Sequence, residues 1–179
     1  MVQGEGTHLE IERSFLLRAC PALPPEAIAL RMEQGYLDPS APGDDPSGIV
    51  EGRLRRVRHP DGRVECVHTV KRGSGLVREE TEREIDATTF ERLWAFTAGR
   101  RLSKTRHVVA HGDLKWEVDV FDDVDLVLVD VELPRADAPA PVPPWLEGWI
   151  EREVTDDPRY RNFAIALRIA RGSGAPDGS

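Results

Sequence analysis

The sequence predicts an α+β fold in which antiparallel strands dominate and a few amphipathic helices pack against them. Segments such as 116–120 and 129–133 alternate apolar and charged residues, and this period of two is typical of strands. The pair Asp61-Gly62 lies between two strand-like segments and predicts a hairpin, hence antiparallel pairing. Apolar residues spaced three or four apart after Asp86 predict a helix instead.

The composition fits one water-soluble domain of 179 residues. We expect a domain over residues 1–171 and a disordered, small and polar tail over residues 172–179. The net charge of -8 argues against a protein that coats nucleic acid. No apolar run approaches the roughly 20 residues of a membrane-spanning helix. The two cysteines, Cys20 and Cys66, are not in a metal or redox spacing, and the N-terminus lacks a secretory pattern, so we expect a cytoplasmic protein.

Three helices are predicted from capping residues and apolar spacing. The first begins at Pro24-Pro25 and carries Ile28 and Leu30, since proline is tolerated in a first helical turn. The second runs from Asp86, as the N-cap, to Gly99. The third begins at Asp157-Pro158 and ends near Arg171.

The predicted strands share one feature, which is a face that carries charged side chains at positions i and i+2. In chain order these positions are Glu10 and Glu12, Arg53 and Arg55, Lys71 with Thr69, Glu80 and Glu82, Lys104 and Arg106, Glu117 and Asp119, and Asp130 and Glu132. Two arrangements fit the pattern. In the first, the sheet is open and its charged face is exposed to solvent. In the second, the sheet closes and the charged face lines a lumen.

The second arrangement requires a ligand, because interleaved carboxylates and cations are costly to remove from water. Paired acids on one strand can hold Mg²⁺ or Mn²⁺ through oxygen ligands. Paired arginine and lysine side chains can bind phosphate oxygens. Together these groups describe a site for a polyphosphate and a divalent cation.

A set of motifs in a fixed order is more specific than any single pair. They are Glu10–Leu17, Gln34–Leu37, Arg53–Arg55, Thr69–Lys71, Arg78–Glu82, Gly99–Arg106, Trp116–Phe121, Val129–Glu132, Glu153–Thr155 and Tyr160–Asn162. This set resembles the CYTH domain, also called the triphosphate tunnel metalloenzyme family, and it spans nearly the whole chain. The most similar branch is that of the small stand-alone bacterial members.

The resemblance implies an eight-stranded antiparallel β-barrel, which forms a tunnel, with helices packed outside. It also implies roles for the charged residues. The metal ligands would be Glu10, Glu12 and Glu132, with Asp130 nearby; the phosphate-binding residues would be Arg53, Arg55, Lys71, Lys104 and Arg106. The remaining tunnel acids would be Glu80, Glu82, Glu117 and Asp119, which either place a second metal or balance the basic groups.

One position departs from the family pattern. Ser14 stands where the first family motif has a lysine, which in the small bacterial branch works with the tyrosine that corresponds to Tyr36. A serine hydroxyl carries no positive charge and is no comparable base. Three outcomes follow for Ser14: slower hydrolysis, a changed substrate preference, or binding without turnover. Tyr36 is either the catalytic tyrosine or a core residue.

The resemblance therefore implies hydrolysis of a linear triphosphate with Mg²⁺ or Mn²⁺, with inorganic tripolyphosphate favoured over organic triphosphates. The alternatives are a catalytically silent triphosphate or nucleotide sensor, because of Ser14, and a class IV-type adenylate cyclase. The expected partners are a small molecule that contains a triphosphate and a second copy of the chain in a homodimer. Neither nucleic acid nor a membrane is expected.

Overall fold

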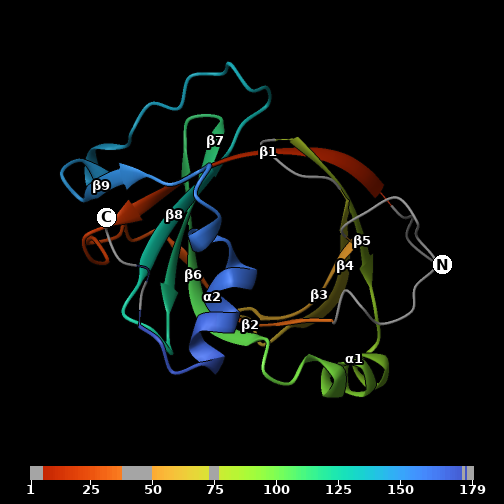
Figure 1. Cartoon of the computed structure of the whole chain (residues 1–179). Coiled ribbons are helices and arrows are strands. Elements are labelled where there is room, and N and C mark those ends of the chain that lie inside the picture. Colours follow the sequence, from red (N-terminus) through yellow and green to blue (C-terminus); the bar gives the residue numbers. More distant parts are fainter. Residues whose placement is uncertain (1–5, 38–49, 73–76, 175, 177–179) are drawn as a thin grey trace.

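The computed structural model describes residues 6–37, 50–72, 77–174 and 176 (Figure 1). The expected loop at 38–48 and part of the expected disordered tail therefore lie outside the described residues. The strands are β1 (Gly6–Leu17), β2 (Ile28–Tyr36), β3 (Val50–Arg58), β4 (Val64–Arg72), β5 (Val77–Glu84), β6 (Arg101–His111), β7 (Leu114–Phe121), β8 (Val127–Glu132) and β9 (Ile150–Glu153). The helices are α1 (Ala87–Trp94) and α2 (Asn162–Ala170), and short 3₁₀ turns lie at Ala95–Thr97, Pro144–Leu146 and Pro158–Tyr160.

The strands form one antiparallel sheet in the order β5-β4-β3-β2-β6-β7-β8-β1-β9. The long strand β1 pairs with β8 along one edge. Along its other edge, Gly6–Ile11 pairs with β5 and Phe15–Leu17 pairs with β9. The fold is therefore a tunnel-like α+β arrangement of nine strands, one more than expected, and Figure 1 shows the strands curving around a central axis.

The predicted hairpin between β3 and β4 is confirmed. Arg55 pairs with Val67 in the antiparallel register. Gly62 has a φ of 87°, a conformation that favours glycine, and the Asp61 carboxylate accepts a hydrogen bond of 2.9 Å from the backbone N–H of Arg63. These turn residues set which side chains of β3 and β4 share a face.

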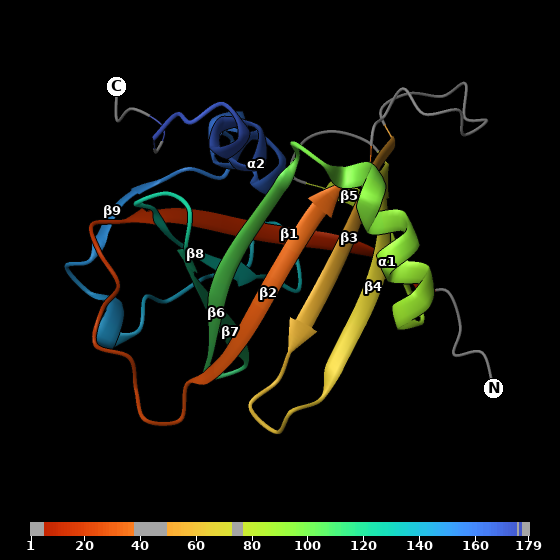
Figure 2. The same ribbon diagram turned by 90° about the horizontal axis from the view of Figure 1, so that it is seen from below.

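The predicted helix after Asp86 is also confirmed. The Asp86 carboxylate caps α1 by accepting a 2.9 Å hydrogen bond from the backbone N–H of Thr89. Its buried Phe90 packs on Leu54 and Cys66, which lie on the outer face of β3 and β4 (Figure 2). The guanidinium carbon of Arg56 lies 4.4 Å from the centre of the Phe90 ring and adds a cation–π contact. Helix α1 therefore packs outside the sheet, as expected.

The other predicted helices differ from the structure. The segment after Pro24 forms a turn, with a 3.0 Å hydrogen bond from Ala27 N–H to Pro24 O, and the strand β2 begins at Ile28. Pairing on both edges, with β3 and β6, explains why this segment is a strand. At the C-terminus, the 3₁₀ turn at Pro158–Tyr160 precedes α2. Among the described residues, no helix is long and apolar enough to cross a membrane.

Helix α2 covers the inward face of the sheet at one end of the strands, rather than its outside (Figure 2). Its buried Ile165 and Ala166 pack with Leu102, Phe121 and Leu128. These three strand residues alternate in phase with Lys104, Asp119 and Asp130, so they project from the charged face. A second apolar cluster around Trp116 and Val129 has the opposite phase and forms the core behind the charged face.

Candidate active site

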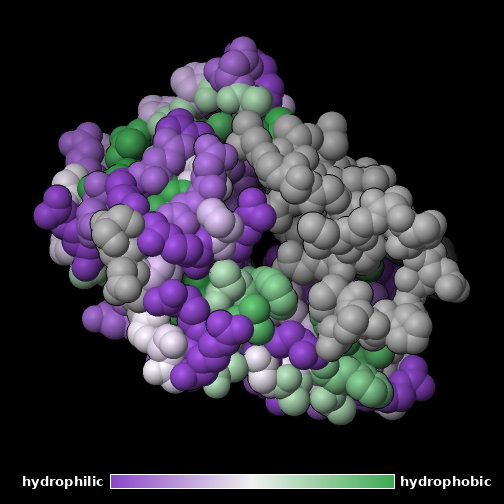
Figure 3. Space-filling view, viewed as in Figure 1, coloured by the Kyte–Doolittle hydropathy of each residue, from purple (hydrophilic) through white to green (hydrophobic). Residues whose placement is uncertain are grey.

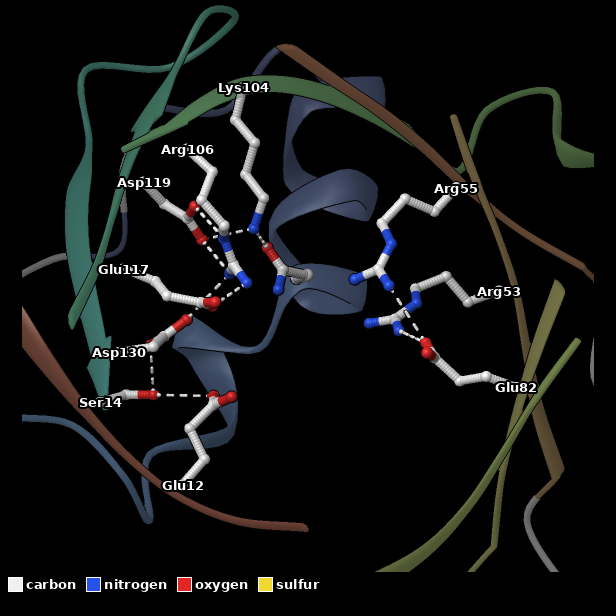
Figure 4. Close-up of polar contacts among 11 residues, drawn as sticks. Glu12, Ser14, Arg53, Arg55, Glu82, Lys104, Arg106, Glu117, Asp119 and Asp130 are labelled. Carbon is white, nitrogen blue, oxygen red and sulfur yellow. Dashed lines mark hydrogen bonds and ion pairs between the residues drawn. The ribbon is translucent and has the colours of Figure 1, made fainter. Parts of the chain in front are cut away.

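The strand register brings the same-face charged residues of neighbouring strands side by side. Arg106 lies opposite Asp119, and Glu117 lies opposite Asp130. Ser14 also lies opposite Asp130, and Glu12 lies opposite Glu132. Glu132, the last residue of β8, is exposed. Because α2 covers one end of this face and the sheet curves around it, Arg106, Asp119 and Asp130 lie inside the molecule (Figure 4). The interpretation of a solvated outer face is therefore wrong for these residues.

Two charged groups face each other across the interior in Figure 4. The first, which we call the acid-rich wall, comes from β1, β6, β7 and β8 and consists of Glu12, Ser14, Lys104, Arg106, Glu117, Asp119 and Asp130. The second, which we call the arginine wall, comes from β3, β4 and β5 and consists of Arg53, Arg55, Thr69 and Glu82. On the face in Figure 3 the molecule is hollowed near its centre.

Arg106 organises the acid-rich wall. Its guanidinium donates two hydrogen bonds of 2.7 Å to the two carboxylate oxygens of Asp119, which is the bidentate geometry that arginine favours. It also pairs with Glu117, and its Nη2 lies 3.3 Å from Oδ2 of Asp130. Lys104 donates a 2.5 Å hydrogen bond to Asp119 as well. Two cations thus hold three carboxylates together in the interior.

The electrostatics of this wall separate its two aspartates. Burial alone would raise the pKa of Asp119, but the charges of Arg106 and Lys104 lower it to about 2. Burial, with the neighbouring Asp119 carboxylate, raises the pKa of Asp130 to about 6. Burial lowers the pKa of Lys104, against the opposing effect of Asp119. Asp119 is therefore a permanent anion near neutral pH, while Asp130 is the carboxyl that protonates first.

Ser14 occupies the position of the family lysine and takes part in this network. Its hydroxyl donates a 2.7 Å hydrogen bond to Oδ1 of Asp130 and lies 3.5 Å from Oε1 of Glu12. A hydroxyl donor leaves the charge of the carboxylates in place, whereas a lysine would offset one of them. The acid-rich wall is consequently more negative than it would be with the lysine.

The arginine wall contains fewer carboxylates. Nη2 of Arg53 and Nη2 of Arg55 lie 3.3 and 3.1 Å from the same oxygen, Oε1 of Glu82. The Thr69 hydroxyl donates to that oxygen at 3.0 Å and accepts from Nη2 of Arg53 at 3.2 Å. Two guanidinium groups pointing inward beside one carboxylate form a surface that suits an anion with several oxygens.

The carboxylates that could hold a divalent cation lie on β1 and β8. Glu12 and Glu132 are opposite each other in the register, and carboxylate oxygens are the donors that Mg²⁺ and Mn²⁺ prefer. Among the described residues, no group of three or more histidine, cysteine or acidic side chains is close enough to hold a metal. The side chains of Glu10, Lys71 and Glu80 lie outside the described ones. The chemistry of the donors fits a hard cation, with Glu10 as the further ligand that the resemblance implies.

Tyr36 lies at the end of β2, beneath α2. Its side chain is buried in the apolar cluster beneath α2, and its ring contacts Phe163 edge-on with 5.2 Å between ring centres. Its hydroxyl accepts a hydrogen bond of 3.3 Å from the side-chain amide of Gln34. The structure thus favours a packing role for the Tyr36 ring, and a catalytic role stays a prediction.

Two residues that contact the walls were not among the predicted site residues. Thr69 was placed on one face with Lys71 by strand alternation but was given no role in the site. Asn162 is the first residue of α2, and its side-chain oxygen accepts a 3.2 Å hydrogen bond from Lys104. No local pattern in the sequence connects residues 58 positions apart.

Comparison with known proteins identifies relatives that share most of the chain. No protein-family model matches it. The chain is 42% identical over 165 residues to an inorganic triphosphatase from Nitrosomonas europaea, covering 89% of this chain and 98% of that protein. It is 36% identical over 98 residues to an inorganic triphosphatase from Acetivibrio thermocellus, covering 52% of this chain and 60% of that protein. The crystal structure of the inorganic triphosphatase NE1496 superposes with a TM-score of 0.57 at 39% identity, covering 88% of this chain and 97% of that one.

Proposed function

This chain belongs to the inorganic triphosphatase family, and from that premise we propose that it hydrolyses a linear triphosphate with the help of a divalent cation. Inorganic tripolyphosphate is the favoured substrate, and organic triphosphates are the alternative. The observation that carries the proposal is the interior in Figure 4, where a wall of arginines faces a wall rich in carboxylates. One wall suits a phosphate chain and the other suits the cations that accompany it.

The arginine wall would bind the substrate. Arg53 and Arg55 point into the interior, and both guanidinium groups contact the Glu82 carboxylate. Two oxygens of a tetrahedral phosphate group can accept the two parallel N–H donors of a guanidinium group. Lys71, whose backbone lies opposite Glu51 and Glu80 in the register, would extend this basic surface.

Glu12 of the acid-rich wall would hold the cation together with Glu10 and Glu132, with Asp130 nearby. Mg²⁺ or Mn²⁺, when bound there, would polarise the terminal phosphoryl group and orient a water molecule. Attack of the water oxygen in line on the terminal phosphorus would form phosphate, break the bond to the bridging oxygen and release pyrophosphate, with a proton of the water passing to solvent. Arg53, Arg55 and Lys104 would stabilise the negative charge on the phosphoryl oxygens in the transition state.

The proposal includes the finer family assignment to the triphosphate tunnel metalloenzymes, or CYTH domain, in their small bacterial branch. It also includes a closed eight-stranded barrel. The pairing of β1 with β8 and of its first half with β5 supports closure, because these contacts join the two ends of the series β5-β4-β3-β2-β6-β7-β8-β1. In this barrel β9 is an addition beside the second half of β1.

A second candidate function is a catalytically silent triphosphate sensor. Ser14 favours it, because its hydroxyl is engaged by Asp130 and supplies no positive charge to the reacting group. The sensor would bind tripolyphosphate on the same arginine wall but release no phosphate. The two candidates therefore agree on binding and differ in turnover.

The experiment measures phosphate release from tripolyphosphate with Mg²⁺, with Mn²⁺ and with a chelator, for the native chain and for Ser14→Lys. We expect metal-dependent release by the native chain and a higher kcat for Ser14→Lys, by roughly tenfold, because an ammonium group then faces the substrate beside Asp130. Calorimetric binding without release, and release gained only in Ser14→Lys, would establish the sensor. Formation of cyclic AMP from ATP would establish the cyclase, and the absence of both binding and release would overturn the proposal.

Two further expectations remain predictions. They are a homodimer and a cytoplasmic location. The measurements are the solution mass by light scattering and the location of a tagged chain in cell fractions.

A further inference from the structure

Lys104 is the most enclosed charged side chain of the interior. It is fully buried, at 0% exposure, on the charged face of β6. An ammonium group has three N–H donors, and in the part of the chain that the structure describes two acceptors meet them. They are Oδ2 of Asp119 at 2.5 Å and Oδ1 of Asn162 at 3.2 Å, and the ring of Phe121 lies 5.3 Å from Nζ.

The two acceptors come from different parts of the fold. Asp119 lies on β7, the direct neighbour of β6 in the sheet. Asn162 lies 58 positions away in the sequence, at the first turn of α2, so its place depends on how that helix docks. The docking is apolar, because Ile165 and Ala166 are buried against Leu102 and Phe121.

The side chain of Asn162 is not used to cap its own helix. Asparagine is favoured at helix N-termini because its oxygen accepts from backbone N–H groups of the first turn. In α2 the N-cap residue is Arg161, and no side chain caps the helix. The Asn162 oxygen accepts from Lys104 instead, so the residue connects the helix to the charged interior.

From these contacts we propose that Asn162 is a positioning residue, whose amide oxygen holds the Lys104 ammonium group beside Asp119 so that its positive charge remains directed at the phosphate oxygens of the substrate. The role in substrate binding rests on the proposed triphosphatase function. Asp119 fixes the ammonium from the sheet and Asn162 fixes it from α2. Without the second acceptor, the long lysine side chain has more rotamers available and pairs with Asp119 alone.

The test compares Asn162→Leu, which removes the acceptor at similar size, with Asn162→Asp, which keeps an oxygen in its place. We expect Asn162→Leu to raise KM for tripolyphosphate about tenfold with a smaller change in kcat, since one hydrogen bond to a charged group is lost. Asn162→Asp should restore most of the affinity. Ile165→Val, in the apolar face of the same helix, controls for loosened packing and should lower the melting temperature without changing KM.

A double-mutant cycle with Lys104→Met separates positioning from a structural role. If Asn162 acts through Lys104, Asn162→Leu has little further effect on KM once Lys104 is replaced. An equal tenfold effect in both backgrounds, or a native KM in Asn162→Leu, would overturn the proposal.

A readout without substrate keeps this test independent of the enzymatic one. In protein with ¹⁵N-labelled lysine, the Lys104 ammonium group should exchange its hydrogens slowly, and Asn162→Leu should accelerate that exchange while Ile165→Val should not. Unchanged exchange in Asn162→Leu contradicts the positioning contact itself. Accelerated exchange in a chain that neither binds nor hydrolyses tripolyphosphate would instead mean that the contact exists and the proposed function is wrong.

Discussion

The two walls of the interior contain similar types of charged residue, but these residues have different roles. In the acid-rich wall, two cations lie among four carboxylates, and its central side chains are almost fully buried, with Lys104 at 0% and Asp119 at 1% exposure. In the arginine wall, two cations share Glu82, and the exposure rises to 19% for Arg55 and 35% for Glu82. The difference teaches that the role of a charged side chain depends on its position in the network rather than on its residue type.

The acid-rich wall satisfies its charges internally. The Lys104–Asp119 pair is fully buried, and Arg106 and Asp119 have several partners each, so these ion pairs stabilise one another and hold carboxylates near the proposed cation site. The arginine wall is closer to solvent, and its guanidinium groups would bind an anionic substrate. Variants of the same residue type on the two walls should therefore have different consequences.

The largest expected effect is on the rate of phosphate release, and it appears when glutamate-to-glutamine substitutions on the two walls are compared. Glu12→Gln should reduce metal-dependent phosphate release by roughly 100-fold or more, because a proposed metal ligand loses its charge. Glu82→Gln should leave kcat within about threefold, because this carboxylate pairs with Arg53 and Arg55 and is not among the proposed metal ligands. Both are measured by steady-state kinetics with Mg²⁺ and Mn²⁺.

Glu151→Gln, an exposed position on β9, serves as the control for loss of an acidic charge. Full metal-dependent activity in Glu12→Gln would remove the distinction between the walls. A loss in Glu82→Gln as large as that in Glu12→Gln would instead mean that Glu82 also holds a metal.

The next effect concerns stability and compares one arginine from each wall. Arg106→Met leaves Asp119, Glu117 and Asp130 together without their shared cation, and breaking such a buried network costs about 3 kcal/mol. Arg55→Met removes one of two cations beside a partly exposed glutamate and should cost about 1 kcal/mol or less. Urea unfolding at neutral pH measures both. Equal losses in the two variants would contradict the difference between the walls.

The smallest effect is the acid stability that Asp119 contributes. Its pKa of about 2 lies below the usual aspartate value of about 3.9 in the unfolded chain. The stabilisation is therefore complete above about pH 4 and is lost as the pH falls through 2, by about 2 kcal/mol. Asp119→Asn should remove this part of the decline in urea unfolding between pH 5 and 2, and the exposed Asp113→Asn should keep it. If the free energy of unfolding of Asp119→Asn fell between pH 5 and 2 as much as that of the native chain, the pair with Arg106 would stabilise the fold little.

Much of the fold could be predicted from local patterns. The alternation in Trp116–Val120, the Asp61-Gly62 turn and the Asp86 cap all occur as expected, because each depends on residues a few positions apart. The helix predicted to begin at Pro24-Pro25 and to carry Ile28 and Leu30 is wrong. These two residues are two positions apart, which is the spacing of one face of a strand, and the strand is held by pairing with β3 and β6.

The site was predicted in part. Alternation alone identifies Lys104, Arg106 and Asp119 as residues on one face, but it does not say which carboxylate pairs with which cation. The sharing of Glu82 by two arginines and the contact of Asn162 with Lys104 depend on distant segments. They could not be predicted, because a strand pattern contains no information about what docks on its end.

The sequence by itself determined that one face of each strand is charged, because successive strand residues point to opposite faces whatever the strand pairs with. It also placed Ser14 on that face, two positions from Glu12. Only the tertiary structure decided that the face lies inside, that α2 covers one of its ends, and that its charges divide into two unlike walls. Those outcomes depend on the curvature of the sheet and on the packing of apolar side chains from segments far apart in the chain. Burial then makes each charged group depend on the partner beside it.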